Sequence, residues 1–219
     1  MDTPSHHAST RDLSLSNQER WRAYLHFLGI FLAVFVPIYV GSGHLLTQLP
    51  DRSIHLLLEW EKSIPLIPWM IWPYLSLFSL YALPLLHMNE HDMKQLSRQS
   101  VVAILVAGIF FISIPTKIGF SPVVVTGLHE SIFRLIASVD TPFNLVPSLH
   151  VAGATLVVLG CVKRVGIGLA RIYQIWLATL MISTVLVHQH HIIDAFAGFI
   201  LALTIRRAIP ISGPVTADA

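Results

Sequence analysis

The residues whose types and spacing best suit chemistry lie within residues 183–198, STVLVHQHHIIDAFAG. This stretch places His188, His190, His191 and Asp194 among apolar side chains. Ionisable side chains are costly inside a bilayer and usually mark function there. His190 and Asp194 are four residues apart, so on a helix they would share a face. The carboxylate could then orient the imidazole and stabilise its protonated form.

A second histidine, His150, opens another apolar run in the sequence VPSLHVAG. Two histidines, one of them oriented by a carboxylate, suit nucleophilic and general-acid chemistry near neutral pH. Ser148 stands where a helix would begin, and the free backbone N–H groups of that helix would face an anion. Acyl transfer would instead need a serine or cysteine nucleophile poised by a base. The pattern therefore favours phosphoryl transfer through a phosphohistidine.

The composition indicates that membrane-spanning helices position these residues. Hydrophobic residues make up 54% of the 219-residue chain and charged residues 12%, against about 25% charge in soluble domains. The only cysteine, Cys161, excludes an intramolecular disulfide. Basic residues sit at the ends of apolar runs rather than in a stripe interleaved with aromatic residues, so we expect no nucleic-acid partner. We expect no cofactor and no metal, with a membrane lipid as substrate, and leave the oligomeric state open.

We predict an all-α integral membrane protein with a bundle of six transmembrane helices. The predicted spans are residues 23–40, 64–86, 101–115, 149–162, 169–187 and 192–205. Several are shorter than the ~20 residues that a lone helix needs, so neighbouring helices must shield them. Between the third and fourth spans, apolar side chains repeat at helical spacing: Leu128, Ile132, Leu135, Ile136 and Val139. This repeat predicts an amphipathic helix lying at the membrane interface.

The predicted domain organisation is a single catalytic membrane domain, residues 21–209, between two tails. Residues 1–20 are polar and are expected to form a disordered cytoplasmic tail, and residues 210–219 a short second tail. With the N-terminus inside, ten of the 14 lysines and arginines fall at cytoplasmic ends. This excess predicts that both termini are cytoplasmic and that His150, His190 and Lys117 meet at the extracytoplasmic face. The expected location is the plasma (inner) membrane of a bacterium.

Two motifs make the sequence resemble the type 2 phosphatidic acid phosphatase superfamily. They are Pro-Ser-x-His, here PSLH at residues 147–150, and His-x-x-x-Asp, here HHIID at residues 190–194. The resemblance covers most of residues 23–205 and implies a six-span fold. It also implies that His190 is the nucleophile, that Asp194 orients it, and that His150 protonates the leaving oxygen.

The same resemblance assigns phosphate binding to Lys117, Ser148 and Thr184, but the sequence departs from the family pattern twice. The arginine expected after Lys117 is missing from KIGFSPVVV, and Ser183-Thr184 stands where Ser-Arg is usual. The Ser-Thr version and the SLH sequence resemble the branch that contains inositol phosphorylceramide synthases. Lys117 as an interfacial anchor remains an alternative.

The expected function is hydrolysis of a lipid phosphate or diphosphate at the extracytoplasmic face through a phosphohistidine. Transfer of a phospholipid headgroup to a lipid alcohol is the alternative. The missing arginines favour that alternative, because a phosphodiester carries less negative charge than a terminal phosphate. A metalloprotein with His188, His190, His191 and Asp194 as ligands, or a transporter, is more remote. Transporter sites lie near the bilayer midplane, whereas these residues end or begin spans.

Overall fold

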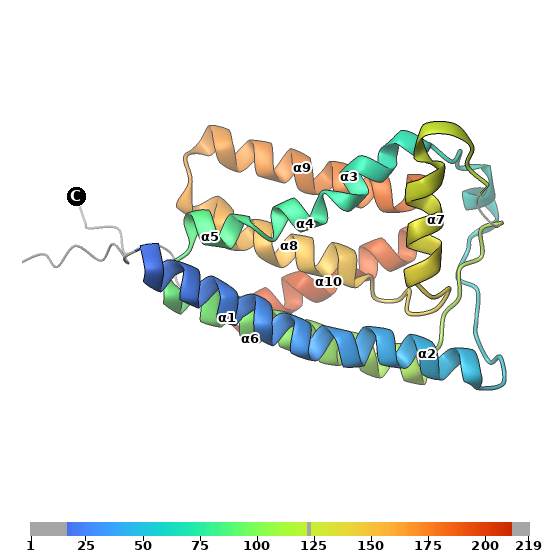
Figure 1. Ribbon diagram of the computed structural model, residues 1–219, viewed down its shortest axis with the longest axis horizontal. Helices are drawn as coiled ribbons and strands as arrows, with labels where there is room; N and C mark the ends of the chain where they lie inside the picture. The colour runs from blue at the N-terminus through green and yellow to red at the C-terminus, as the bar shows by residue number, and fades with distance from the viewer. Residues whose placement is uncertain (1–16, 122–123, 212–219) are drawn as a thin grey trace, which may run out of the picture.

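The computed structural model describes residues 17–121 and 124–211, and helices dominate them. An isolated parallel bridge joins Ile54 to Thr116. The long helices run side by side along the long axis of the molecule, and one short helix crosses one end (Figure 1). The predicted all-α class is therefore confirmed for these residues. The predicted tails lie largely outside them, although the last four residues of the N-terminal one begin the first helix.

Within the part of the chain that the structure describes, three helices are long and apolar enough to cross a membrane. The first is continuous over Asn17–Gln48 and consists of α1 (Asn17–Phe35), the π-helical turn η1 (Val36–Val40) and α2 (Gly41–Gln48). The others are α6 (Glu90–Ser113) and α9 (Ile167–Leu186). They contain much of the first, third and fifth predicted spans, and all three extend beyond the predicted starts. Pro37 lies in the π turn. Proline interrupts the regular backbone hydrogen bonds of a helix, and a π turn is one way in which a helix continues past such an interruption.

The predicted second span, residues 64–86, is not one helix. After the short turn η3 (Pro68–Met70) it divides into α3 (Ile71–Leu75), α4 (Leu77–Leu80) and α5 (Leu83–His87). Proline lacks a backbone donor, and Pro73 and Pro84 interrupt this segment. Ser76, between α3 and α4, donates its hydroxyl hydrogen to Pro73 O at 2.6 Å and accepts from Trp176 Nε1 at 2.7 Å. The second bond connects this interruption of the helix to α9.

The predicted fourth and sixth spans form α8 (Leu149–Cys161) and α10 (Ile192–Ala208), both shorter than the ~20 residues of an isolated span. Helix α8 is the centre of the core, because 11 of its 13 residues are buried against its neighbours. Small residues allow this close approach. A Cβ atom on Gly198 of α10 would collide with the backbone oxygen of Ser148, and one on Gly153 would collide with the Tyr81 hydroxyl.

The predicted amphipathic helix is present as α7 (Glu130–Val139), and it lies across one end of the bundle (Figure 1). Its inner side chains Phe133 and Ile136 are buried in a cluster with Ile71 and Tyr74, whereas Leu135 on its outer face is 63% exposed. The remaining short elements are η2 (Glu59–Ser63), η4 (Gly127–His129) and η5 (Val162–Arg164). Helix α7 therefore covers the end at which α8 and α10 begin.

The opposite end, where α8 and α10 finish, is held by two arginines, and we call it the arginine end. Arg164 pairs with Asp92 at 2.7 Å, and both side chains are at most 7% exposed. Arg164 also donates to Gly160 O, and Arg206 donates to Leu159 O at 3.1 Å. The carbonyl groups that α8 leaves unpaired at its C-terminus thus face cations, as the helix dipole favours.

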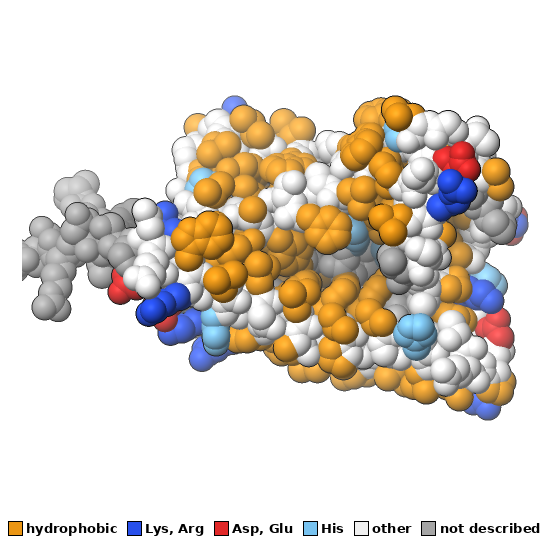
Figure 2. All heavy atoms as spheres, viewed as in Figure 1, with side chains coloured by type: hydrophobic (Ala, Val, Ile, Leu, Met, Phe, Trp, Pro, Cys, Tyr) orange, Lys and Arg blue, Asp and Glu red, His pale blue; other side chains and the backbone are white. Residues whose placement is uncertain are grey.

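On the face shown in Figure 2, hydrophobic side chains cover the middle, and most charged side chains lie toward the two ends. The exposed apolar side chains include Phe78, Ile109 and Ile175, each at least 65% exposed. A soluble monomer rarely exposes apolar surface on this scale. Together with the three long apolar helices, this surface indicates association with a membrane.

Candidate functional site

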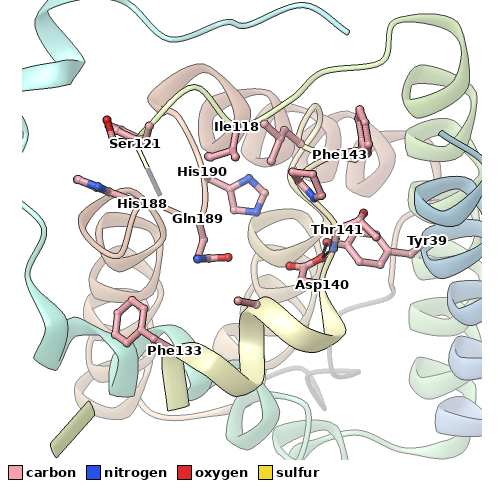
Figure 3. A pocket seen from close by; sticks show the side chains of 14 residues that line it. Tyr39, Ile118, Ser121, Phe133, Asp140, Thr141, Phe143, His188, Gln189 and His190 are labelled. Carbon is pink, nitrogen blue, oxygen red and sulfur yellow. Dashed lines mark hydrogen bonds between the residues drawn. The ribbon is translucent and has the colours of Figure 1, made fainter. Parts of the chain in front are cut away.

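A cavity of about 270 Å³ lies at the end covered by α7, which we call the histidine end (Figure 3). It is lined by Tyr39, Ile118, Phe120, Ser121, Phe133, Ala137, Asp140, Thr141, Pro142, Phe143, Leu145, His188, Gln189 and His190. These residues come from the π turn η1, the loops before and after α7, α7 itself and the connection between α9 and α10. Figure 3 shows the ring of His190 pointing into the hollow.

His190 is held by a tight turn between α9 and α10. The backbone N–H groups of Gln189 and His190 both donate to Thr184 O, at 3.1 and 3.0 Å. His188 adopts a left-handed backbone conformation, with φ of 57°, which lets the chain reverse there. His190 therefore precedes α10 instead of lying on it, and the expected shared helical face with Asp194 is not how the two residues meet.

Asp194 reaches His190 as the capping carboxylate of α10. Its Oδ2 accepts from the backbone N–H of His191 at 2.8 Å, in a capping-box arrangement. The same oxygen lies 3.5 Å from Nδ1 of His190 and 3.5 Å from Nδ1 of His191. Asp194 is fully buried. The predicted partnership of His190 and Asp194 is thus present, produced by helix capping rather than by helical periodicity.

The other ring nitrogen of His190 faces the start of α8. Its Nε2 lies 3.1 Å from Oγ of Ser148, the N-cap residue of that helix. Ser148 Oγ also accepts from Val151 N at 3.3 Å, and Ser148 N donates to Asp194 O at 3.1 Å. The first backbone N–H groups of a helix lack intrahelical partners and attract anions. His190 Nε2 therefore stands at a position that suits an anionic group.

His150 lies in the first turn of α8, at the same end of the molecule as His190, but it is not among the residues that line the cavity. Its Nε2 is 3.1 Å from Tyr74 O, and because a carbonyl only accepts, this nitrogen carries a proton. The imidazole also stacks on the Tyr74 ring, with 4.1 Å between the ring centres. Nδ1 of His150 is the nitrogen left for proton exchange.

Lys117 and Thr184 make other contacts in this structure. Lys117 Nζ pairs with Asp51 at 3.1 Å and lies 5.5 Å from the centre of the Phe143 ring, whose residue lines the cavity. Hydrogen bonds from Ser53, followed by that from Lys117, hold the pKa of Asp51 below its usual range. Thr184 is fully buried and donates its hydroxyl to Met181 O at 2.8 Å. Its carbonyl is the acceptor that holds the His190 turn.

Asp140 is a residue of this site that the sequence reasoning missed. Its Oδ1 accepts from the Tyr39 hydroxyl and from Thr141 N, both at 2.9 Å, and its Oδ2 has no hydrogen-bond partner among the described residues. Burial raises the pKa of Asp140, although the hydrogen bond from Tyr39 and the one from Thr141 lower it. The available signal was an aspartate directly before the loop that leads into PSLH.

A second buried carboxylate, Glu61, connects two segments next to the site. Its Oε1 accepts from Ile192 N at 2.7 Å and its Oε2 from Leu58 N at 2.8 Å, so it ties the η2 segment to the start of α10. His191 accepts at Nε2 from Gly119 N at 3.1 Å. Burial lowers the pKa of His191, while Asp194 and Glu61 act in the opposite direction. His191 is thus a neutral link between loops.

The predicted site residues therefore fall into two groups. The structure brings together His190, Asp194 and Ser148, whereas His150, Lys117 and Thr184 lie near them with other hydrogen-bond partners. The described residues contain no group of three or more His, Cys, Asp or Glu side chains arranged to hold a metal ion. Comparison of the sequence with known protein families and with curated proteins finds no match.

Proposed function

We propose that this protein transfers phosphoryl groups of membrane lipids, with Nε2 of His190 as the nucleophile. The observation that carries the proposal is the position of the His190 ring on the cavity wall. Asp194 lies at its Nδ1, and the N-terminus of α8 lies at its Nε2. A carboxylate beside Nδ1 favours the tautomer protonated there, and a modest approach of the two groups would let it hold that proton while Nε2 presents its lone pair. In the proposed complex the phosphorus would lie next to Nε2, and the backbone N–H groups at the start of α8 would stabilise its oxygens.

In the first step Nε2 attacks phosphorus and the bond from phosphorus to the departing oxygen breaks. That oxygen leaves with a proton, and the proposed donor is the doubly protonated ring of His150, which gives up its Nδ1 proton and keeps the Nε2 proton bound to Tyr74 O. In the second step water or an alcohol attacks the phosphohistidine, the N–P bond breaks, and His150 takes the proton of the attacking group. Asp194 balances the charge that the imidazole gains.

The proposed membrane arrangement has six spans, with both termini in the cytoplasm and the histidine end at the extracytoplasmic face of the plasma membrane. In it α8, α10 and the broken segment α3–α5 complete the bundle begun by the three long helices. The arginine end then faces the cytoplasm, as the excess of basic residues requires. Single cysteines at Ser53 and Ser121, in a Cys161→Ser background, should react with an impermeant thiol reagent in intact cells. Reaction only after lysis would reverse this orientation.

Two acceptors and two substrate types compete within this proposal. The resemblance to the phosphatase superfamily favours hydrolysis of a lipid phosphate or diphosphate. The cavity lining favours the second candidate, headgroup transfer from a phosphodiester, because no lysine or arginine is among its described residues. Lys117, whose Nζ lies 5.5 Å from the centre of the Phe143 ring, is ion-paired with Asp51. A terminal phosphate with almost two charges needs more positive charge than this.

The deciding assay offers phosphatidic acid, a polyprenyl diphosphate and a phosphodiester lipid to the detergent-solubilised protein, each with and without a lipid alcohol. Free phosphate from the first two would support hydrolysis. A new phospholipid that forms only when the alcohol is present would support transfer. With a lipid labelled at phosphorus, the protein should carry an acid-labile label that His190→Ala abolishes. Absence of both turnover and label with every substrate would refute the phosphohistidine mechanism.

A further inference from the structure

The charge of the cavity determines which headgroup fits it. Asp140 is the one carboxylate among the described lining residues, which include neither lysine nor arginine. Its Oδ2 lacks a hydrogen-bond partner among the described residues, while Oδ1 is fixed by Tyr39 and Thr141. Figure 3 shows Asp140 and His190 on neighbouring walls of the same hollow. A phosphodiester bound at His190 would bring a second negative charge close to this oxygen.

The described side chains near Asp140 supply little positive charge: His190 lowers the pKa of Asp140, but as the proposed nucleophile it reacts in its neutral form. The ammonium group of Lys117 forms an ion pair with Asp51. Burial lowers the pKa of His188, which favours its neutral form, although the hydrogen bond from its Nε2 to Ile64 O opposes this shift; its ring stacks on Phe120 at 4.1 Å. Two anions confined in one small cavity repel each other strongly unless a cation joins them. That cation must therefore come from the substrate.

The aromatic side chains of the lining suit such a cation. Phe133 and Phe143 stand on different walls, and Tyr39 holds the carboxylate (Figure 3). Aromatic faces combined with a carboxylate are the chemistry that recognises quaternary ammonium groups. A hydroxyl-rich headgroup could donate a hydrogen bond to Asp140, but it would leave both negative charges uncompensated. The cavity thus favours an ammonium headgroup over a polyol one.

We propose that the cavity selects phosphodiester lipids with a cationic ammonium headgroup, and that Asp140 is the residue that determines this specificity. The phosphodiester would lie at His190 and the α8 N-terminus, with the ammonium group against Asp140 Oδ2 and the aromatic rings. The inference rests on the proposed function of His190 for the placement of the phosphate. It assigns the lipid class that the same site takes.

The test uses binding, so that it does not depend on turnover. Glycerophosphocholine and glycerophosphoglycerol are soluble phosphodiesters that differ in whether the headgroup carries a cation. Titration calorimetry with the detergent-solubilised full chain should show that glycerophosphocholine binds at least about tenfold more tightly, as expected for an ion pair with cation–π contacts. Equal binding of the two, or no binding of either at millimolar concentration, would overturn the inference.

Two variants identify the residue responsible. Asp140→Asn removes the charge but keeps an oxygen that can accept from Tyr39 and Thr141, so the preference for glycerophosphocholine should disappear. Glu130→Gln is the matched control, because it removes one charge from α7 at a residue that does not line the cavity. The preference should survive in it. A preference that survives in Asp140→Asn would refute the assignment to Asp140.

The failure of this inference differs from the failure of the proposed function. The phosphohistidine label depends on His190, whereas the headgroup preference depends on Asp140. A labelled protein that binds both phosphodiesters equally would keep the proposed function and overturn this inference. A protein that prefers glycerophosphocholine and forms no label with any lipid would keep the headgroup site and refute the nucleophile.

Discussion

The two ends of α8 bury ionisable groups in opposite ways. At the arginine end, Arg164 meets Asp92 at 2.7 Å, and the arginine also donates to Gly160 O. At the histidine end, Asp194 lies 3.5 Å from Nδ1 of His190, too far for a good hydrogen bond in this structure. Nδ1 of His190 and Oδ1 of Asp194 are both buried and have no hydrogen-bond partner among the described residues. The arginine end is arranged for stability, and the histidine end keeps unsatisfied groups that chemistry can use.

The largest expected effect is the loss of turnover when the histidine end loses its nucleophile. His190→Ala should lower turnover by at least about 10³-fold, because it removes the proposed nucleophile that lies beside both Asp194 and Ser148. Thermal unfolding in detergent should change far less. The matched control is His129→Ala, a histidine of η4 that does not line the cavity. If His190→Ala turned over substrate as fast as this control, His190 would not be the nucleophile.

The arginine end should respond in the opposite manner. Arg164→Ala leaves Asp92 buried without its partner, which typically costs about 3–5 kcal/mol of the free energy of unfolding. Turnover per folded molecule should stay within about twofold, because this end is far from the cavity along α8. Arg134→Ala breaks a pair with Glu130 whose arginine is 73% exposed, and it should cost less than about 1 kcal/mol. Similar losses in the two variants would contradict the assignment.

A smaller effect is expected from Gly198→Ala, which tests how α10 positions the histidine end. The added Cβ atom would meet the backbone oxygen of Ser148, so α8 and α10 must separate there. Overpacking of this kind costs about 1–3 kcal/mol, and the shift should lower turnover because Ser148 faces His190 Nε2. Gly29→Ala in α1 meets no atom and should change neither measurement. Unchanged turnover in Gly198→Ala would show that the site tolerates the shift.

The smallest effect concerns pH. Burial holds the pKa of His191 below its ordinary value of 6.5, with Asp194 and Glu61 opposing and His190 and His55 adding to the shift. The unfolded chain therefore binds the proton first, and stability should fall as the pH drops below about 6.5, by at most ~1.4 kcal/mol per pH unit for one proton. His191→Gln should flatten this dependence in thermal unfolding between pH 7 and pH 5. An unchanged slope would assign the dependence to another group.

The sequence was sufficient to predict the helical class, the helix α7 and the meeting of His190 with Asp194. Apolar runs and helical spacing are local signals, which explains this success. The break of the second segment at Ser76 was missed, because hydropathy averages over the prolines and does not register the Trp176 contact. The capping role of Asp194 was also missed, because the cap joins Asp194 to His191, three residues away, whereas the prediction used the four-residue spacing between His190 and Asp194.

The role of Asp140 could not be predicted for a different reason. Its partner Tyr39 is 101 residues away in the sequence, so no short motif joins them. The assignments of Lys117 and Thr184 to phosphate binding remain predictions, because their observed partners are Asp51 and Met181. Residues at a site are recognisable by type and local spacing. Which of them face the same hollow depends on long-range packing.

The length of the first helix has a consequence for the bilayer. Its 32 residues extend about 48 Å at 1.5 Å per residue, well beyond a hydrocarbon core of about 30 Å. In a bilayer this helix must tilt or project beyond the hydrocarbon core. The tilt angle or the projecting length depends on the difference between the helix length and the bilayer thickness. Tyr39 lies toward the C-terminal end of this helix. Its hydroxyl donates to Asp140, and its backbone carbonyl accepts from Asn144 Nδ2 at 2.7 Å. A change in the tilt of this helix would therefore shift the residues that form the cavity wall around Asp140.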